Sequence, residues 1–237
     1  MTLLSSDTAE FPSLPGGWAE KRLTNHRGQL LRFWYPQSPD ACLTDEYCET
    51  QSEDYTVDPY WVSVWSATHQ LVPLLPQFCQ EGQACLELGC GTGLAGMTAA
   101  LAGMEVTLTD LHPQAVQTAL ANCKGNQLSA KGMALKWSCE PEDALSLLVG
   151  SKAFDLILAV DVLYEQQGHR ALLATLKRHL HSQGKLLIAD PGRPQLKPFL
   201  EMAQHDFELE FYNAEGERRE DSQLHHFALV CLRYSER

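Results

Sequence analysis

The chain has 237 residues, 44% of them hydrophobic and 20% charged, as expected for a globular protein with one sizeable core. No apolar run reaches the roughly 18 residues of a membrane span, and the N-terminal residues lack the pattern of a signal peptide. The formal net charge of -12 disfavours nucleic acid, whose phosphates attract basic surfaces. We therefore expect neither a membrane nor a nucleic-acid partner.

Cysteine and histidine spacing predicts no bound metal. The eight cysteines include no Cys-x-x-Cys pair, so neither a zinc site nor a set of disulfides is indicated. Several cysteines lie within apolar runs, where they would act as small buried side chains. A reducing compartment suits such thiols, and we expect a monomeric protein of the cytoplasm.

The first 58 residues differ in composition from the rest of the chain. They carry four prolines and most of an acidic, aromatic tract over 40–60. Residues 24–35 are strand-like on one side of His26-Arg-Gly28 and predict a short hairpin around it. We expect an N-terminal extension or lid over 1–58, followed by the main domain over 59–237.

The main domain is predicted to alternate strands and helices. A helix over 62–78, with an apolar stripe and two prolines near its end, comes first. The expected strands then cover 84–88, 105–109, 133–138, 154–160 and 184–189, and the expected helices cover 93–102, 113–126, 141–149, 167–181 and 195–204. This alternation predicts a parallel sheet with helices on both faces.

The C-terminal part breaks the alternation. Residues 207–212 and 224–232 read as two strands with a solvated loop, and no helix, between them. They predict an antiparallel hairpin at the end of the sheet. The expected fold is therefore α/β: a doubly wound, mostly parallel seven-stranded sheet of Rossmann-like type, with an N-terminal extension.

The strongest chemical signal is a glycine-rich turn after the first strand of the sheet. Glu87 stands near the end of that strand, and Gly89, Gly91 and Gly93 follow. Glycines let the backbone approach a ligand closely, and the next helix offers free N–H groups. The second strand ends in Asp110, whose carboxylate can bind the two hydroxyls of a ribose. The pattern predicts a nucleoside-containing cofactor.

Two cofactor classes compete for this turn. Residues 91–96 match the dinucleotide pattern Gly-x-Gly-x-x-Gly, which would indicate NAD. Glu87, however, would repel a pyrophosphate and could instead meet a cationic amino group. The long preceding segment and the terminal hairpin also differ from a plain dinucleotide fold. S-adenosyl-L-methionine carries an ammonium group and a ribose without a phosphate, so it is the cofactor we predict.

Three motifs together resemble those of a known enzyme family. Glu87-Leu-Gly-Cys-Gly-Thr-Gly93, Asp110 and Asp161-Val-Leu-Tyr164 are similar to the motifs of seven-strand S-adenosylmethionine-dependent methyltransferases. The Asp-x-x-Tyr sequence after the fourth strand resembles that of the protein lysine methyltransferases among them. The resemblance implies a class I methyltransferase domain, and a protein substrate that presents a lysine.

Two further segments resemble a narrower group. Asp58-Pro-Tyr-Trp-Val-Ser-Val-Trp65 and Ala189-Asp-Pro-Gly-Arg-Pro-Gln195 look like those of the electron-transfer-flavoprotein beta-subunit lysine methyltransferases. The Ser-Ala-Thr-His that follows Trp65 departs from the Pro/Gly-rich segment expected there, and the first motif looks more like other lysine methyltransferases. The resemblance covers residues 58–195 and continues weakly to the end.

Several residues are candidates for holding the cofactor, each with a structural alternative. Asp110 would bind the ribose and Leu111 would pack on the adenine. Glu87 would meet the amino group of the cofactor, or satisfy N–H groups of the glycine turn. Trp137 would lie beside the adenine, as the resemblance implies, or in the core. Trp65 would contact the methionine end, or pack against the helix that follows it.

Asp161 and Tyr164 are the candidate catalytic residues, and Asp161 is also a candidate for binding the cofactor. Because they follow the strand 154–160, they should face the cofactor crevice at the carboxyl edge of the sheet. Asp161 would orient the lysine amine and Tyr164 would line its channel; the alternative is a helix cap and a packed tyrosine. Arg193, after the fifth strand, would shape the substrate entrance or belong to a structural turn.

Three functions remain open on the sequence. A protein lysine methyltransferase is favoured by the Asp-x-x-Tyr and Asp-Pro-Gly-Arg sequences. A small-molecule methyltransferase would use the same cofactor. A binding protein with a decayed site is the third, and the intact glycines and acids argue against it.

Overall fold

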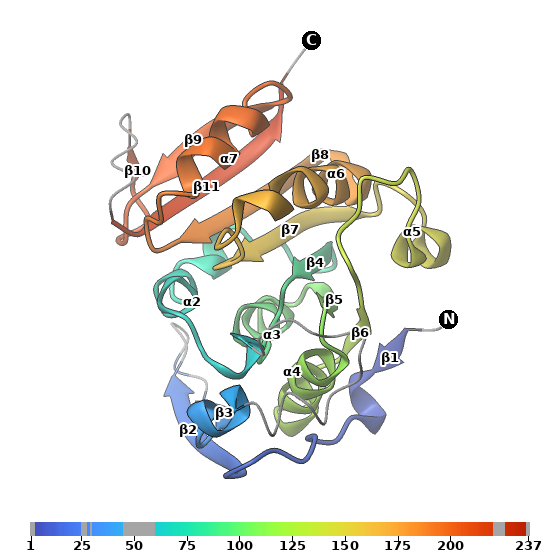
Figure 1. Ribbon diagram of the computed structural model, residues 1–237, viewed down its shortest axis with the longest axis vertical. Helices are drawn as coiled ribbons and strands as arrows, with labels where there is room; N and C mark the ends of the chain where they lie inside the picture. The colour runs from blue at the N-terminus through green and yellow to red at the C-terminus, as the bar shows by residue number, and fades with distance from the viewer. Residues whose placement is uncertain (1–2, 25–27, 29, 45–59, 220–225, 236–237) are drawn as a thin grey trace.

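The computed structural model describes residues 3–24, 28, 30–44, 60–219 and 226–235. A large mixed sheet runs through the molecule, in the strand order β1-β6-β5-β4-β7-β8-β11-β9-β10 (Figure 1). Its longer strands are β4 (Ala84–Leu88), β5 (Glu105–Asp110), β6 (Ala130–Ala134), β7 (Phe154–Val160), β8 (Leu180–Asp190), β9 (Phe207–Tyr212) and β11 (Ala228–Tyr234). The strands from β6 to β8 are parallel, and β11 inserts antiparallel between β8 and β9. The α/β fold and the terminal antiparallel hairpin are confirmed.

The sheet has nine strands among the described residues, where the sequence predicted seven. The two additional strands are β1 (Leu4–Ser5) and β10 (Arg218–Arg219), which pair antiparallel at opposite edges. A strand of two residues is too short to show an alternation of polar and apolar side chains. Such strands form by pairing with a neighbouring strand and cannot be predicted from the sequence.

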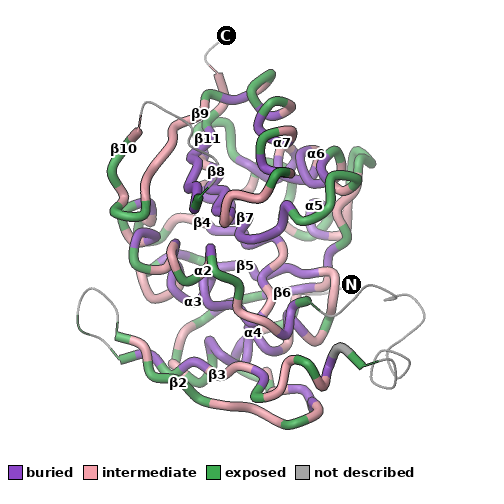
Figure 2. The backbone as a smooth tube through the Cα atoms, turned by 60° about the vertical axis from the view of Figure 1, so that its left-hand side comes forward, coloured by how far each residue is buried: buried purple, intermediate pink, exposed green. Residues whose placement is uncertain are grey.

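Helices cover both faces of the sheet (Figure 1). One core cluster joins one face to α2 (Ser66–Leu71), α3 (Leu94–Leu101) and α4 (Pro113–Gly125). A second cluster joins the other face to α5 (Ala144–Val149), α6 (His169–His179) and α7 (Leu196–Ala203). In β7, Ile157 and Ala159 belong to the second cluster while their neighbours belong to the first, as side-chain alternation requires. The central strands are accordingly buried on both faces (Figure 2).

The predicted N-terminal hairpin is present as β2 (Trp18–Thr24) and β3 (Leu30–Pro36), which pair antiparallel beside α4 (Figures 1 and 2). Its turn, at 25–27 and 29, lies outside the described residues. Short 3₁₀ helices, η1 (Ser6–Thr8) and η2 (Pro39–Leu43), flank the hairpin. The division into an extension over 1–58 and a domain over 59–237 stays a prediction, although β1 already belongs to the main sheet.

The single helix predicted over 62–78 is wrong. The segment forms three short pieces: η4 (Tyr60–Val62), α2, and η5 (Leu75–Gln77). Pro73 and Pro76 lack the N–H that a continuous helix would need, so the helix ends after α2. The start of α2 meets Asp161 at the carboxyl edge of the sheet.

Two strand boundaries also differ from prediction. The third strand was expected at 133–138 and is found at 130–134, because its register follows β5, where Val106 pairs with Ala130. Glycine is unusual within a strand. At position 132 a side chain would not fit, because a Cβ there would lie 2.7 Å from a methyl group of Val116 in α4. The fifth strand begins at 180 rather than 184, and the Ser-Gln-Gly sequence lies inside it.

None of the helices in the described part of the chain is long and apolar enough to cross a bilayer. Among the same residues, no group of three or more histidine, cysteine and acidic side chains is placed to hold a metal ion.

A buried ion pair attaches the segment after β6 to α6. Arg178 donates to Asp143 (2.6 Å) and to the carbonyls of Ser138, Glu140 and Pro141. Burial raises the pKa of Asp143, but hydrogen bonds from the Ser146 N–H, His179 and Arg178 outweigh it and lower the pKa overall. The segment is therefore held to α6 by an ion pair whose two side chains are both buried.

Arg178→Met should lower the free energy of unfolding by about 3–5 kcal/mol, because it leaves a buried carboxylate without its cation. Lys177→Met is the matched control. Lys177 pairs with Asp206 at the same distance, 2.6 Å, but the lysine side chain is 39% exposed. We expect the control to lose less than about 1 kcal/mol in urea denaturation. Equal losses would show that burial does not strengthen the Arg178 pair.

Candidate active site

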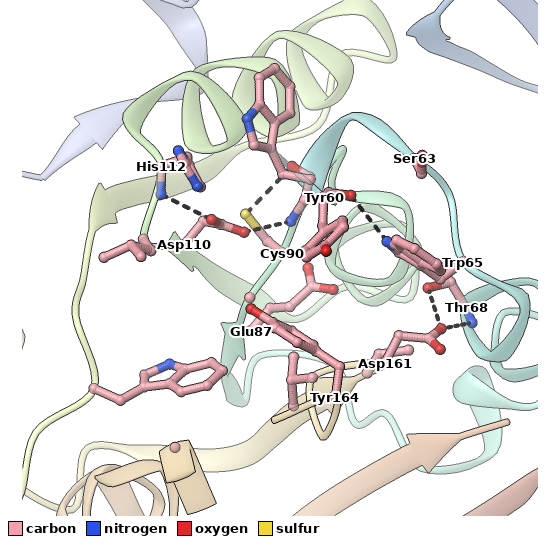
Figure 3. A pocket seen from close by; sticks show the side chains of 18 of the residues that line it. Tyr60, Ser63, Trp65, Thr68, Glu87, Cys90, Asp110, His112, Asp161 and Tyr164 are labelled. Atoms are coloured by element: carbon pink, nitrogen blue, oxygen red, sulfur yellow. Dashed lines mark hydrogen bonds between the residues drawn. The ribbon is translucent and has the colours of Figure 1, made fainter. Parts of the chain in front are cut away.

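A cavity of about 390 Å³ opens at the carboxyl ends of β4, β5 and β7 (Figure 3). Asp110 lies at one end of it, Trp65 and Asp161 at the other, and Glu87 and Tyr164 between them. Nine of the ten residues predicted for the site line this cavity: Trp65, Glu87, Gly89, Gly91, Asp110, Leu111, Trp137, Asp161 and Tyr164.

The tenth, Gly93, is not among the lining residues and has a packing role. It starts α3 with a φ of 84°, and a Cβ there would lie 2.5 Å from the Cβ of Ala119 in α4. Gly89 also has a positive φ, 72°, and a Cβ there would lie 2.7 Å from a Val162 methyl group. Larger residues at both positions would combine backbone strain with a clash.

Asp110 fixes the glycine loop from the adjacent strand. One carboxylate oxygen accepts the Gly91 N–H and the other accepts the His112 N–H, each at 3.0 Å. Burial raises the pKa of Asp110, and these two hydrogen bonds partly offset the rise. Each carboxylate oxygen has a second lone pair, so Asp110 can still accept hydrogen bonds from a ligand in the cavity.

Glu87 is only 3% exposed and accepts the Gly96 N–H at 2.9 Å, in the first turn of α3. The pKa of Glu87 is raised to about 8, chiefly by burial and in part by the charge of Asp110, while the Gly96 N–H lowers it. The predicted role in satisfying an N–H group near the glycine turn is therefore present, and the same carboxyl group also lines the cavity. A cationic group bound beside it would stabilise its charged form.

Asp161 lies directly after β7 in a left-handed conformation, with a φ of 59°, that is uncommon for a residue with a side chain. Its carboxylate accepts the Thr68 N–H from α2 at 3.1 Å and a guanidinium N–H of Arg193 at 3.1 Å. Burial raises the pKa of Asp161, while Arg193 and the Thr68 N–H lower it and Asp190 raises it. These contacts hold Asp161 at the cavity wall.

Arg193 joins two strand ends. Besides Asp161, it pairs with the fully buried Asp190 at 3.0 Å, and its own backbone N–H donates to that carboxylate at 2.7 Å. Its guanidinium also lies 6.0 Å from the centre of the Trp65 ring. The structural alternative for the Asp-Pro-Gly-Arg sequence is therefore present, a fixed turn whose arginine supports Asp161. A role of Arg193 at the substrate entrance stays a prediction, since Arg193 is not among the residues that line the cavity.

Three aromatic rings form the mouth of the cavity. Tyr60 packs edge-to-face against Trp65 and Tyr164, with ring centres 6.1 and 5.8 Å apart, and the Trp65 indole donates to the Tyr60 carbonyl at 3.1 Å. Each of the three residues is about 40% exposed: 39%, 39% and 41%. Sequence reasoning quoted Tyr60 within a motif but gave it no role; its position in an aromatic segment was the available signal.

Trp137 lies beyond the end of β6, since the strand stops at Ala134. It lines the cavity and also packs against the second core cluster, so the two predicted placements are not exclusive. Three further residues line the cavity without having been predicted for the site: Thr68, and Cys90 and Thr92 of the glycine loop. Thr68 could not be found from the sequence, because its partner Asp161 lies far away in the chain, after β7.

Comparison with known proteins decides among the cofactor classes. Residues 50–206 match the family model described as lysine methyltransferase. The chain belongs to this family. It is 39% identical over 198 residues to protein N-lysine methyltransferase METTL21A of Danio rerio, covering 79% of this chain and 78% of that protein.

Other similar proteins match a smaller part of the chain. The electron transfer flavoprotein beta subunit lysine methyltransferase of Xenopus laevis is 32% identical over 143 residues, or 58% of this chain; the chain spans about half of that protein, 54%. Among solved structures, a TehB-like S-adenosylmethionine-dependent methyltransferase from Corynebacterium glutamicum has a TM-score of 0.56 at 23% identity, covering 70% of this chain and 88% of that one. This likeness concerns the fold.

These findings confirm the predicted family, its cofactor S-adenosylmethionine, and protein lysine as the acceptor class of the family. The cavity fits the cofactor chemically. Glu87 and Asp110 offer carboxylates for an ammonium group and a ribose, and Leu111 and Trp137 offer apolar surface for a purine. A dinucleotide, with its pyrophosphate, would have to lie near two buried acids.

Glu87→Gln should make the cofactor-free protein less sensitive to pH. An acid whose pKa rises on folding is held protonated by the folded protein. Its stabilising effect is complete below the ordinary pKa of 4.5 and is lost as the pH rises through about 8. The stability of the variant relative to the wild type should therefore rise between about pH 4.5 and pH 8, by up to about 5 kcal/mol in all.

Chemical denaturation from pH 5 to 9 measures this difference, with the exposed Glu105→Gln on β5 as the control. Parallel stability curves for wild type and Glu87→Gln would contradict the raised pKa.

Proposed function

We propose that this protein transfers a methyl group from S-adenosylmethionine to the ε-amino group of a lysine in a protein substrate. The observation that carries the proposal is the arrangement at one end of the cavity. There the buried Asp161 stands beside a mouth of three exposed aromatic rings, on the same cavity as the two acids suited to the cofactor.

The proposed cofactor seat follows the length of the cavity. Asp110 receives the ribose hydroxyls, while Leu111 and Trp137 enclose the adenine. Glu87 lies between the two ends and receives the amino group of the methionine part, directly or through water. Trp65 contacts the methionine end. Gly89 and Gly91 let the backbone approach the cofactor, and Gly93 supports them through its packing on α4.

The proposed chemistry needs a neutral amine aligned with the methyl group that the cofactor supplies. An amine among aromatic rings and away from water loses its proton more readily, because burial disfavours the charged form. Asp161 then orients the amine through a carboxylate oxygen and stabilises the positive charge that develops on nitrogen. Tyr164, whose pKa burial also raises, stays neutral and lines the channel.

A protein acceptor is favoured over a small molecule by the shape of the mouth. Tyr60, Trp65 and Tyr164 face solvent around the opening, so a side chain can enter while its backbone remains outside. A net charge of -12 favours a basic surface around the acceptor lysine. The charge also disfavours nucleic acid, and we propose a monomer.

A reducing compartment such as the cytoplasm is part of the proposal. Six cysteines in the described part of the chain are free thiols: Cys79, Cys85, Cys90, Cys123, Cys139 and Cys231.

The direct test uses S-adenosylmethionine carrying a labelled methyl group, a cell lysate and the purified protein. We expect label in a protein band, and mass spectrometry to place the added mass on lysine. Label confined to small metabolites would instead support the small-molecule alternative.

Asp161→Asn should lower kcat about 100-fold and Tyr164→Phe about tenfold, with both variants folded. Asp161→Asn removes the charge that orients the amine, whereas Tyr164→Phe keeps the ring. Asp155→Asn, at the other end of the same strand, and Tyr212→Phe, in β9, are matched controls outside the cavity. Near-normal turnover in both site variants would remove these assignments.

A further inference from the structure

Two asparagines, Asn122 within α4 and Asn126 at its C-terminal cap, pair with the backbone of β3 as a neighbouring strand would. Asn122 accepts the Trp34 N–H at 2.8 Å and donates to the Trp34 carbonyl at 2.9 Å. Asn126 accepts the Arg32 N–H at 2.8 Å and donates to the Arg32 carbonyl at 2.6 Å. Four helical residues advance about 6 Å and two strand residues about 6.6 Å, so the two spacings nearly match.

The two asparagines differ in their remaining contact. The second N–H of Asn122 donates at 3.0 Å to the carbonyl of Thr92, which belongs to the glycine loop and lines the cavity. Asn126 instead donates to the carbonyl of Asn122 at 2.8 Å and to the sulfur of Met97 in α3 at 3.4 Å. Of the two, therefore, Asn122 alone touches both the hairpin and the cofactor loop.

Asn122 is buried, so the loss of any of its hydrogen bonds would be costly. The residue is 0% exposed, so an N–H that lost its acceptor could not turn to water. Ala119, one turn earlier on the same face of α4, lies against the loop residue Gly93. The loop contains three glycines with positive φ, whose backbone is free to move unless something fixes it.

The hairpin is docked by shape as well as by hydrogen bonds. A Cβ on Gly125 would lie 2.4 Å from the Trp34 ring, so the ring fits only against a residue without a side chain. Phe11 also packs against the Trp34 ring, and the two ring centres lie 5.6 Å apart. The position of β3 on α4 is thus specific, and it sets the position of the Asn122 amide.

We infer that Asn122 is a positioning residue for the cofactor: it fixes the Thr92 peptide of the glycine loop and couples that loop to the N-terminal hairpin. Cofactor binding and hairpin docking then support each other, because both require the same orientation of one amide. Coupling of this kind is reciprocal. If docking of the hairpin increases the affinity for the cofactor, the bound cofactor stabilises the docked hairpin by the same free energy. The inference concerns cofactor binding and does not depend on which acceptor the enzyme methylates.

The matched pair Asn122→Ala and Asn126→Ala tests the link to the loop. Each variant loses two bonds to β3, but only the first loses the bond to Thr92. We expect the Kd for S-adenosylmethionine, measured by calorimetry, to rise about tenfold for Asn122→Ala and less than about twofold for Asn126→Ala. The KM for the protein acceptor should not change in either. Equal cofactor affinities in the two variants would overturn the inference.

A second measurement on the wild-type protein decides the matter even if Asn122→Ala fails to fold. By reciprocity, S-adenosylmethionine should slow hydrogen exchange of the Trp34 amide, which Asn122 accepts, by more than it slows that of Val230 in the distant β11. The excess should persist in Asn126→Ala. An equal effect on the two amides would show that the hairpin and the cofactor loop are independent.

Discussion

Buried carboxylates at one edge of the sheet organise this molecule. Adjacent parallel strands end at or near an acid: Asp110 on β5, Glu87 on β4, Asp161 just after β7 and Asp190 on β8. Each accepts a backbone N–H from the segment that follows it or lies beside it: His112, Gly96, Thr68 and Gly192, respectively. Because parallel strands leave all their carboxyl ends on one side, these bonds shape a single wall of loops around one cavity.

The same carboxylates explain the electrostatic character of the site. Burial raises the pKa of Glu87, Asp110 and Asp161, so the cavity without ligand holds acids that would be better solvated elsewhere. Arg193 relieves Asp161 and Asp190 through direct pairs. Glu87 and Asp110 have no such pair among the described residues, and a cofactor with an ammonium group and hydroxyls supplies what they lack. The two buried acids thus lower the stability of the ligand-free protein at the place where the ligand binds.

The N-terminal hairpin extends this organisation beyond the sheet. Helix α4 faces the hairpin through the amides of Asn122 and Asn126, and it faces the glycine loop through Ala119 and Asn122. The N-terminal hairpin is therefore connected to the cofactor loop through the Asn122 side chain. Its polar bonds replace those of a sheet neighbour, so strand β3 is satisfied without joining the main sheet.

The α/β class, most element positions and the cofactor loop could be predicted from the sequence. Each of these depends on neighbours in the chain: alternating apolar residues, a glycine between strand and helix, an acid at a strand end. Other features depend on contacts between distant parts of the chain. The register of β6 follows β5 and the space beneath α4, which Gly132 leaves open. Thr68, Tyr60 and Asn122 gain their roles from partners tens of residues away, and no local period records such contacts.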